Sequence, residues 1–148
     1  MRNDLRYVRT DRSKNADIII KETPAIKADP ELIRRVFANL IANSLKYSKP
    51  DNAPVVTISS ERQAEKVTFS IADNGIGIEA RHAEKIFEPM QRLHDHDSEY
   101  DGVGIGLPLV KAIIESHGGA IWLDKDYAEG ARFCFSVPTD EVDNRELP

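Results

Sequence analysis

Apolar side chains recur with a period of two in the middle of the chain. Val67, Phe69 and Ile71 alternate with polar residues, which is the pattern of a strand with one buried face. The β-branched run at residues 55–59 precedes it, and residues 62–65 between the two runs are typical of a turn. The pattern therefore predicts two antiparallel strands joined by a hairpin.

Shorter apolar runs predict further strands nearer the two ends. Residues 18–20 form one such run, and residues 25–28 are expected to pair with it. Residues 120–123 and 131–137 are rich in β-branched and aromatic side chains, as strands are. About five strands are expected in the final sheet.

A long helix is predicted from Asp29 to about Tyr47. Aspartate is a favoured N-cap and Pro30 a favoured first helical residue, while Pro50 lies beyond the end. Its apolar side chains recur at three- and four-residue spacings and share one face. They are Ile33, Phe37, Leu40, Ile41 and Leu45.

Two more helices are expected in the second half of the chain. A short one ends at Phe87, because Pro89 follows, and the polar residues 91–103 predict a surface loop. The last helix should begin by about Gly104 or Ile105, since Pro108 is tolerated only in a first turn.

Strands interspersed with helices, two of the strands in a hairpin, indicate an α/β fold with a mixed sheet covered by helices on one face. A chain of 148 residues suits one domain. The domain is expected to span residues 17–138. Residues 1–16 are interpreted as a lead-in or truncated connector, and residues 139–148 as an acidic tail.

Charge and composition exclude several classes of protein. The formal net charge is −5 and the pI is near 5.4, which argues against a nucleic-acid partner. The single cysteine, Cys134, rules out an internal disulfide and fits a reducing cytosol. Apolar runs are far shorter than the roughly 20 residues that cross a bilayer. A cytoplasmic location is expected, either alone or as the cytosolic end of a membrane-bound sensor.

Polar side chains gather on the other side of the long helix. Asn39, Asn43, Lys46 and Tyr47 share roughly 100° of arc. Asparagine is a weak helix former, so two of them in mid-helix suggest amides that ligate a hard cation or orient a water. Lysine could then hold a phosphate as a point charge. A solvated polar face is the alternative that this helix leaves open.

Two glycine-rich segments add to this pattern. Residues 73–78, with Asp73 at a strand end and glycines at 75 and 77, either approach a ligand closely or form a strand-to-loop turn. Residues 102–107 carry three glycines at the start of the last helix, where N–H groups bind phosphates. A flexible hinge with a helix cap is the alternative. Neither segment is a dinucleotide fingerprint or a Walker A loop.

The order of these segments resembles one family. Residues 39–48 resemble the N box of sensor histidine kinases, 73–78 their G1 box, 86–90 their F box and 102–107 their G2 box. Residues 91–94 are also similar to those of phytochrome-type kinases. The resemblance covers about residues 17–138. It implies a two-layer sandwich of a mixed, mainly antiparallel sheet on three helices, the Bergerat-type ATP-binding fold shared with gyrase, the heat-shock chaperone and mismatch-repair ATPases.

The resemblance also implies roles for individual residues. Asn39 and Lys46 would be catalytic, Asn43 would ligate Mg²⁺, and Asp73 would accept a hydrogen bond from the adenine amino group. Arg92 would contact phosphate within an ATP lid at residues 91–103. The implied nucleotide contacts are Asn39, Asn43, Lys46, Tyr47, Asp73, Gly75, Gly77, Ile78, Phe87, Arg92, Gly102, Val103, Gly104, Ile105, Gly106 and Leu107.

Asn39 stands where the related ATPases carry a general-base glutamate. An amide cannot take a proton from water, so transfer to a histidine is favoured over hydrolysis. Met90 replaces the usual second aromatic residue of the F box.

The phosphoacceptor histidine that the family expects is not among the four histidines, His82, His94, His96 and His117, since none has its sequence context. Each is expected to be an ordinary surface or packed residue. The dimerisation helices are missing too, so an excised, monomeric catalytic domain is favoured over a chain that acts on a partner.

The implied function is transfer of the γ-phosphate of Mg–ATP to a histidine on a separate dimerisation domain, with a response regulator as the next partner. No membrane contact is expected. An anti-sigma-type serine kinase of the same fold and a degenerate nucleotide-binding scaffold are the alternatives.

Overall fold

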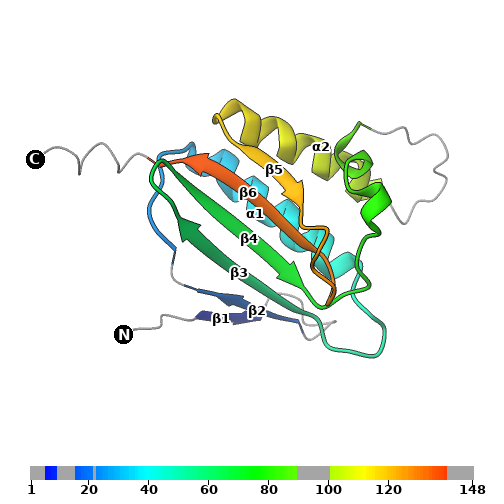
Figure 1. Ribbon diagram of the computed structural model, residues 1–148. Helices are drawn as coiled ribbons and strands as arrows, with labels where there is room; N and C mark the ends of the chain where they lie inside the picture. Colours follow the sequence, from blue (N-terminus) through cyan, green and yellow to red (C-terminus); the bar gives the residue numbers. More distant parts are fainter. Residues whose placement is uncertain (1–5, 10–15, 22, 90–100, 140–148) are drawn as a thin grey trace, which may run out of the picture.

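The computed structural model describes the backbone of residues 6–9, 16–21, 23–89 and 101–139, and their side chains outside 6–9 and 101–105. Its elements, shown in Figure 1, are β1 (Arg6–Arg9), β2 (Asp17–Ile20), α1 (Pro30–Lys46), β3 (Val55–Arg62), β4 (Lys66–Asp73), the 3₁₀ helices η1 (Ala80–His82) and η2 (Lys85–Phe87), α2 (Asp101–Ser116), β5 (Ala120–Leu123) and β6 (Arg132–Pro138).

Six strands form one sheet in the order β1-β2-β3-β4-β6-β5. Strands β2 and β3 run parallel and every other neighbouring pair is antiparallel, which confirms the mixed, mainly antiparallel sheet and the β3–β4 hairpin. The expected count of about five was one too low, because β1 lies within the segment interpreted as a lead-in. Residues 25–28 are not a strand, since β1 and β3 already occupy both edges of β2.

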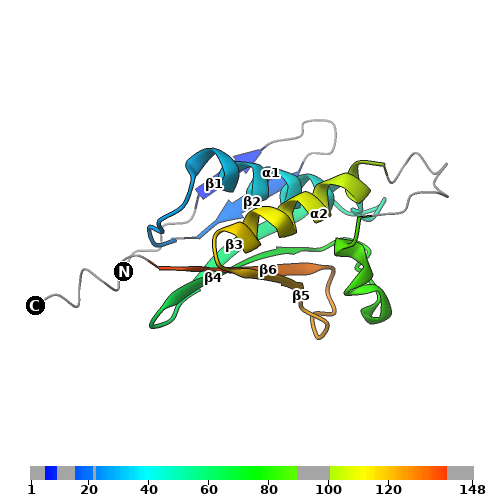
Figure 2. The same cartoon turned by 90° about the horizontal axis from the view of Figure 1, so that it is seen from above.

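Both long helices cover the same face of the sheet, as Figure 2 shows. The Phe37 ring of α1 meets the rings of Phe69 on β4 and Phe135 on β6, with centroids 5.6 and 5.4 Å apart. Leu107, Val110 and Ile114 of α2 are buried beside them. Burial of this shared apolar face is what fixes the helices on the sheet.

Helix α1 begins and ends close to where the sequence predicts. The Asp29 carboxylate accepts hydrogen bonds from the N–H groups of Glu31 and Leu32 at 2.9 and 3.2 Å, and Pro30 is the first helical residue. Tyr47 is the C-cap. The cap therefore satisfies two of the N–H groups that a helix start leaves without partners.

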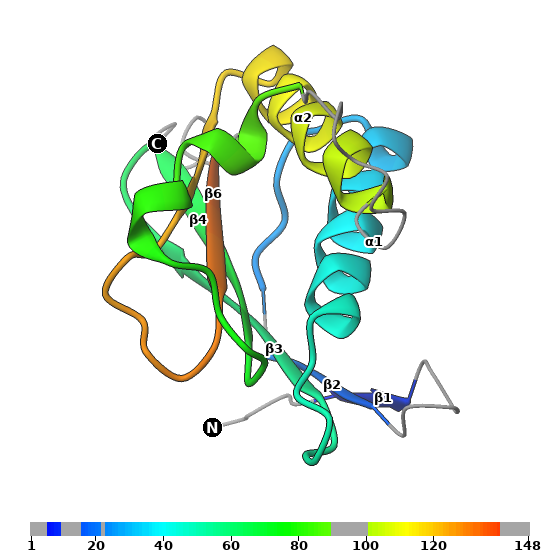
Figure 3. The same ribbon diagram turned by 90° about the vertical axis from the view of Figure 1, so that its right-hand side faces the viewer.

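The other two predicted helices differ from expectation. The segment before Pro89 closes only i→i+3 bonds, such as Ala83 N to Ala80 O, and so forms η1 and η2 instead of one α-helix. Figure 3 shows this segment beside α2. Helix α2 begins at Asp101, three residues before Gly104, so residues 101–103 are helical and Pro108 lies in the helix interior. No helix among the described residues is long and apolar enough to cross a membrane.

His117 ties the end of α2 to the start of α1. The Asp29 N–H donates to His117 Nε2 at 3.1 Å, and His117 Nδ1 lies 2.9 Å from the Ile113 carbonyl oxygen. Because Nε2 accepts, Nδ1 carries the proton and donates to Ile113. His117 is thus a packed residue, as expected, whereas His82 is exposed on η1. His94 and His96 lie outside the described residues.

Replacing His117 by Ala is expected to lower the free energy of unfolding by about 1 kcal/mol, because the inter-helix hydrogen bond is lost. Urea unfolding followed by circular dichroism measures the change. His82→Ala is the matched control and should stay within about 0.5 kcal/mol of the parent. Equal losses of unfolding free energy in both variants would contradict a stabilising hydrogen bond between Asp29 and His117.

Candidate functional site

Asp73, at the end of β4, is a buried carboxylate with one oriented oxygen. Its Oδ1 accepts hydrogen bonds from the N–H groups of Gly75 and Ala131, both at 2.9 Å, and its side chain is only 6% exposed. Within the part of the chain that the structure describes, Oδ2 accepts no hydrogen bond. A carboxylate fixed in this way offers Oδ2 as a single acceptor to a ligand's donor.

The loop after Asp73 lies against the end of α1. The Ile76 N–H donates to the Tyr47 carbonyl oxygen at 3.0 Å, and a Cβ atom at Gly75 would overlap that oxygen. Gly77 has a φ of 83°, which favours glycine. Both glycines of the predicted loop are therefore required by the backbone, which brings Asp73 and Tyr47 to one place.

Two amides on the polar face of α1 have no partners. Asn43 is only 7% exposed, yet neither its side chain nor that of Asn39 makes a hydrogen bond within the described residues. The Ser44 hydroxyl is also buried without a partner there. Buried polar groups are normally hydrogen-bonded, so the Ser44 hydroxyl is an exception, and the two amides remain open to a polar ligand.

The start of α2 adjoins this polar face. A Cβ atom at Gly106 would lie 3.7 Å from the Asn39 Cγ and Oδ1 atoms, so the glycine leaves the amide approachable. Asn39 and Gly106 are thus brought together, as the sequence predicts.

The remaining predicted residues fall into three groups. Phe87 is buried with its ring edge against Phe133, at 6.2 Å between centroids, and Leu107 and Ile78 pack on the core. Lys46 is exposed and Tyr47 partly buried at the end of α1. Residues 102–105 are helical, but their side chains, like Arg92, lie outside what the structure describes.

Residues 28–141 match the family of histidine kinase-, DNA gyrase B-, and HSP90-like ATPases. The chain belongs to this ATPase family. It is 45% identical over 123 residues to the phytochrome-like protein Cph1 of Synechocystis sp., covering 83% of this chain and 16% of Cph1. It is 42% identical to the adaptive-response sensory kinase SasA of Nostoc sp., covering 81% of this chain and 29% of SasA. The chain therefore spans less than a third of these relatives.

Solved structures agree with the family. The catalytic domain of histidine kinase ThkA has a TM-score of 0.68 and 28% identity, over 86% of this chain and 81% of that one. The mycobacterial sensor histidine kinase MprB has a TM-score of 0.70 at 23% identity, over 86% of each chain, which supports the fold. The predicted resemblance to sensor histidine kinases, including phytochrome-type kinases, is confirmed.

The family's nucleotide chemistry fits the residues present. Asp73 Oδ2 suits an amino donor, and the amides of Asn39 and Asn43 suit phosphates and a hard cation. No cluster of three histidine, cysteine or carboxylate side chains occurs in the described part of the chain. The amide oxygens of Asn39 and Asn43 are of the kind that a hard cation accepts.

The sequence did not reveal the loop between β5 and β6, which holds Asp73 from the other side. Ala131 supplies a backbone N–H, which no side-chain pattern reports. Gly130 leaves room, because a Cβ atom there would overlap the Asp73 carbonyl oxygen and lie 2.6 Å from Oδ1. A turn glycine before the last strand was the one available signal. Asn74 also escaped prediction, although its side chain bonds Val55 N and Ala53 O.

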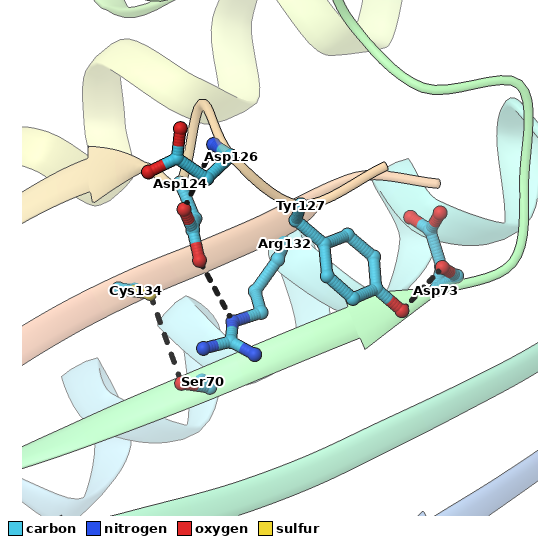
Figure 4. Close-up of polar contacts among 7 residues, drawn as sticks. All are labelled: Ser70, Asp73, Asp124, Asp126, Tyr127, Arg132 and Cys134. Atoms are coloured by element: carbon cyan, nitrogen blue, oxygen red, sulfur yellow. Dashed lines mark hydrogen bonds and ion pairs between the residues drawn. The ribbon is translucent and has the colours of Figure 1, made fainter. Parts of the chain in front are cut away.

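Tyr127 of the same loop donates from its hydroxyl to the Asp73 carbonyl oxygen at 3.3 Å (Figure 4). Burial raises the pKa of Tyr127, the Glu129 and Asp73 carboxylates raise it further, and Arg132 lowers it by less. The neutral phenol that donates this bond is therefore the favoured form in the folded protein.

Gly130→Ala is expected to cost about 3 kcal/mol of unfolding free energy, because the new methyl group collides with backbone. Gly106→Ala is the contrasting variant. Its methyl group meets ordinary contacts in a helix, so stability should rise by about 0.5 kcal/mol. Urea unfolding of both variants checks the signs. A stable Gly130→Ala protein would contradict the close approach.

The raised pKa of Tyr127 predicts a loss of stability in alkali. Below the unfolded value near 10 both states keep the proton, whereas above it the unfolded chain loses its proton first, so the free energy of unfolding falls. Urea unfolding between about pH 9 and about pH 11 should show a steeper fall for the parent than for Tyr127→Phe. Identical slopes would refute the shift.

Proposed function

We propose that this chain is the catalytic, ATP-binding part of a two-component sensor histidine kinase. It binds Mg–ATP and presents the γ-phosphate to a histidine on a separate dimerisation domain. The single open oxygen of Asp73 is the observation that carries the proposal, because its loop packs on the end of α1, the helix that also carries Asn39 and Asn43. We propose that the kinase domain spans residues 17–138 and that β1, which precedes this range, adds an edge strand to its sheet.

Each side chain of the site has a distinct part. Asp73 Oδ2 accepts from the adenine amino group and so orients the base. Asn43 offers an amide oxygen to Mg²⁺, and Lys46 offers a cation to the phosphates. When bound, Mg²⁺ supplies neutralisation of phosphate charge. Catalysis by such a site is positioning and electrostatic stabilisation.

Asn39 favours transfer over hydrolysis. The position holds an amide, which can orient a group but cannot deprotonate water. We infer that the attacking imidazole comes from a separate domain, because His117 is hydrogen-bonded to Asp29 and Ile113 and His82 lacks the sequence context of a phosphoacceptor. In the transfer, the bond from the γ-phosphorus to its bridging oxygen breaks and a phosphorus–nitrogen bond forms on the acceptor.

The relatives support a proposal about the partners of this chain. SasA is named a sensory kinase, and ThkA is found in complex with the response regulator TrrA at 28% identity to this chain. We infer that this chain works beside a dimerisation domain and, through it, with a response regulator. ATP as phosphate donor fits a cytoplasmic setting.

Asp73→Asn is expected to weaken ATP binding at least ten-fold. The variant places an NH₂ donor where Oδ2 accepted a hydrogen bond from the adenine amino group, so two donors face each other. Calorimetric titration with and without Mg²⁺ measures the affinity. Asp126→Asn, an exposed change in the β5–β6 loop, should bind like the parent. Parent protein that is folded but binds no ATP would support a degenerate scaffold instead.

Transfer is tested by joining the chain to a dimerisation domain and adding γ-labelled ATP. The expected product is acid-labile label on a histidine of that domain. Nucleotide binding without any such label would overturn the kinase proposal, and acid-stable label on the target would indicate a serine kinase.

A further inference from the structure

Asp73 lies where the pairing of β4 with β6 stops. The last registered pair of these strands is Ala72 with Arg132, one residue before Asp73. Beyond it, the Asp73 N–H donates to the Ala131 carbonyl oxygen and the Ala131 N–H returns to Asp73 Oδ1, both at 2.9 Å. The orientation of this carboxylate therefore depends on the β5–β6 loop, residues 124–131, and not on the sheet alone.

Tyr127 is the side chain of that loop which reaches Asp73 directly. Its hydroxyl donates to the Asp73 carbonyl oxygen, while the Ala131 N–H binds the carboxylate of the same residue. One contact fixes the backbone carbonyl group of Asp73, and the other fixes its carboxylate. A rotation of the peptide after Asp73 would break the first, and a rotation of the carboxylate would break the second.

The Tyr127 ring is itself held in place. The guanidinium carbon of Arg132 lies 5.5 Å from the ring centroid, and Arg132 Nε pairs with Asp124 Oδ2 at 3.2 Å. The Tyr127 N–H donates to the Asp124 carbonyl oxygen at 3.3 Å. Figure 4 shows the resulting row from Asp124 through Arg132 and Tyr127 to Asp73. The hydroxyl is thus aimed by a partly buried ion pair and a cation–π contact.

We propose that Tyr127 is a positioning residue for adenine recognition, acting through Asp73. The inference rests on the proposed function, because it requires that Asp73 Oδ2 accept from the amino group of the base. Tyr127 touches no nucleotide. It keeps Asp73 in the orientation in which Oδ2 faces the ligand, and the Arg132–Asp124 pair keeps Tyr127 on Asp73.

The test compares two nucleotides that differ only in the adenine amino group, which is proposed to donate to Asp73 Oδ2. ATP carries this amino group, whereas purine riboside triphosphate has hydrogen in its place. Tyr127→Phe keeps the ring under Arg132 and removes only the hydroxyl. The variant is expected to bind ATP about three- to ten-fold more weakly, the effect of one hydrogen bond, and purine riboside triphosphate within about two-fold of the parent.

Asp126→Asn is the matched control. Its backbone N–H donates to Asp124 Oδ1, and this hydrogen bond does not involve the side chain that is changed. This variant should change neither affinity. Tyr127→Phe losing affinity for both nucleotides equally would show a merely structural loop and overturn the inference. Unchanged affinity for both would overturn it as well. If the parent itself binds the two nucleotides equally, the base-reading role of Asp73 fails, and the proposed function is revised along with this inference.

Discussion

The structure depends on a carboxylate held from two sides. Oδ1 of Asp73 receives one N–H from Gly75, two residues on, and one from Ala131, 58 residues on. A local turn and a distant strand end must both be formed before this buried charge is satisfied. Because an unsatisfied buried carboxylate is costly, the glycine loop, β6 and the end of α1 are positioned together.

Helix α1 reconciles two opposing demands. Its apolar face carries Phe37 into the aromatic cluster with Phe69 and Phe135, and Asp29 caps its start, so both features stabilise it. Its other face carries two asparagines, which weaken a helix and whose amides make no hydrogen bond to the part of the chain that the structure describes. The apolar face stabilises the helix and the polar face destabilises it. This is expected where a ligand supplies the hydrogen bonds that the amides lack.

Side-chain patterns predicted the parts of the fold that side chains determine. The alternation of Val67, Phe69 and Ile71 and the Asp29-Pro30 start located β4 and α1, and Asp73 was recognised from its place at a strand end. Strand β1 was missed because its polar residues follow neither period. The hydrogen bond from Ala131 to Asp73 and the close approach of Gly130 were missed. Both are made by backbone atoms far away in sequence, which only the tertiary fold brings to Asp73.

The glycines at residues 102–107 were expected at a helix start whose N–H groups bind phosphates, with a flexible hinge as the alternative. Yet Gly106 lies within a helix, a conformation open to every residue, and glycine there is less favourable than alanine. A Cβ atom there would stand 3.7 Å from the Asn39 amide, which is an ordinary contact, so glycine leaves the amide less covered than alanine would. Pro108 further weakens the first turns, because it cannot donate to the Gly104 carbonyl. Glycine and proline thus lower the stability of the start of α2, which lies beside the Asn39 amide.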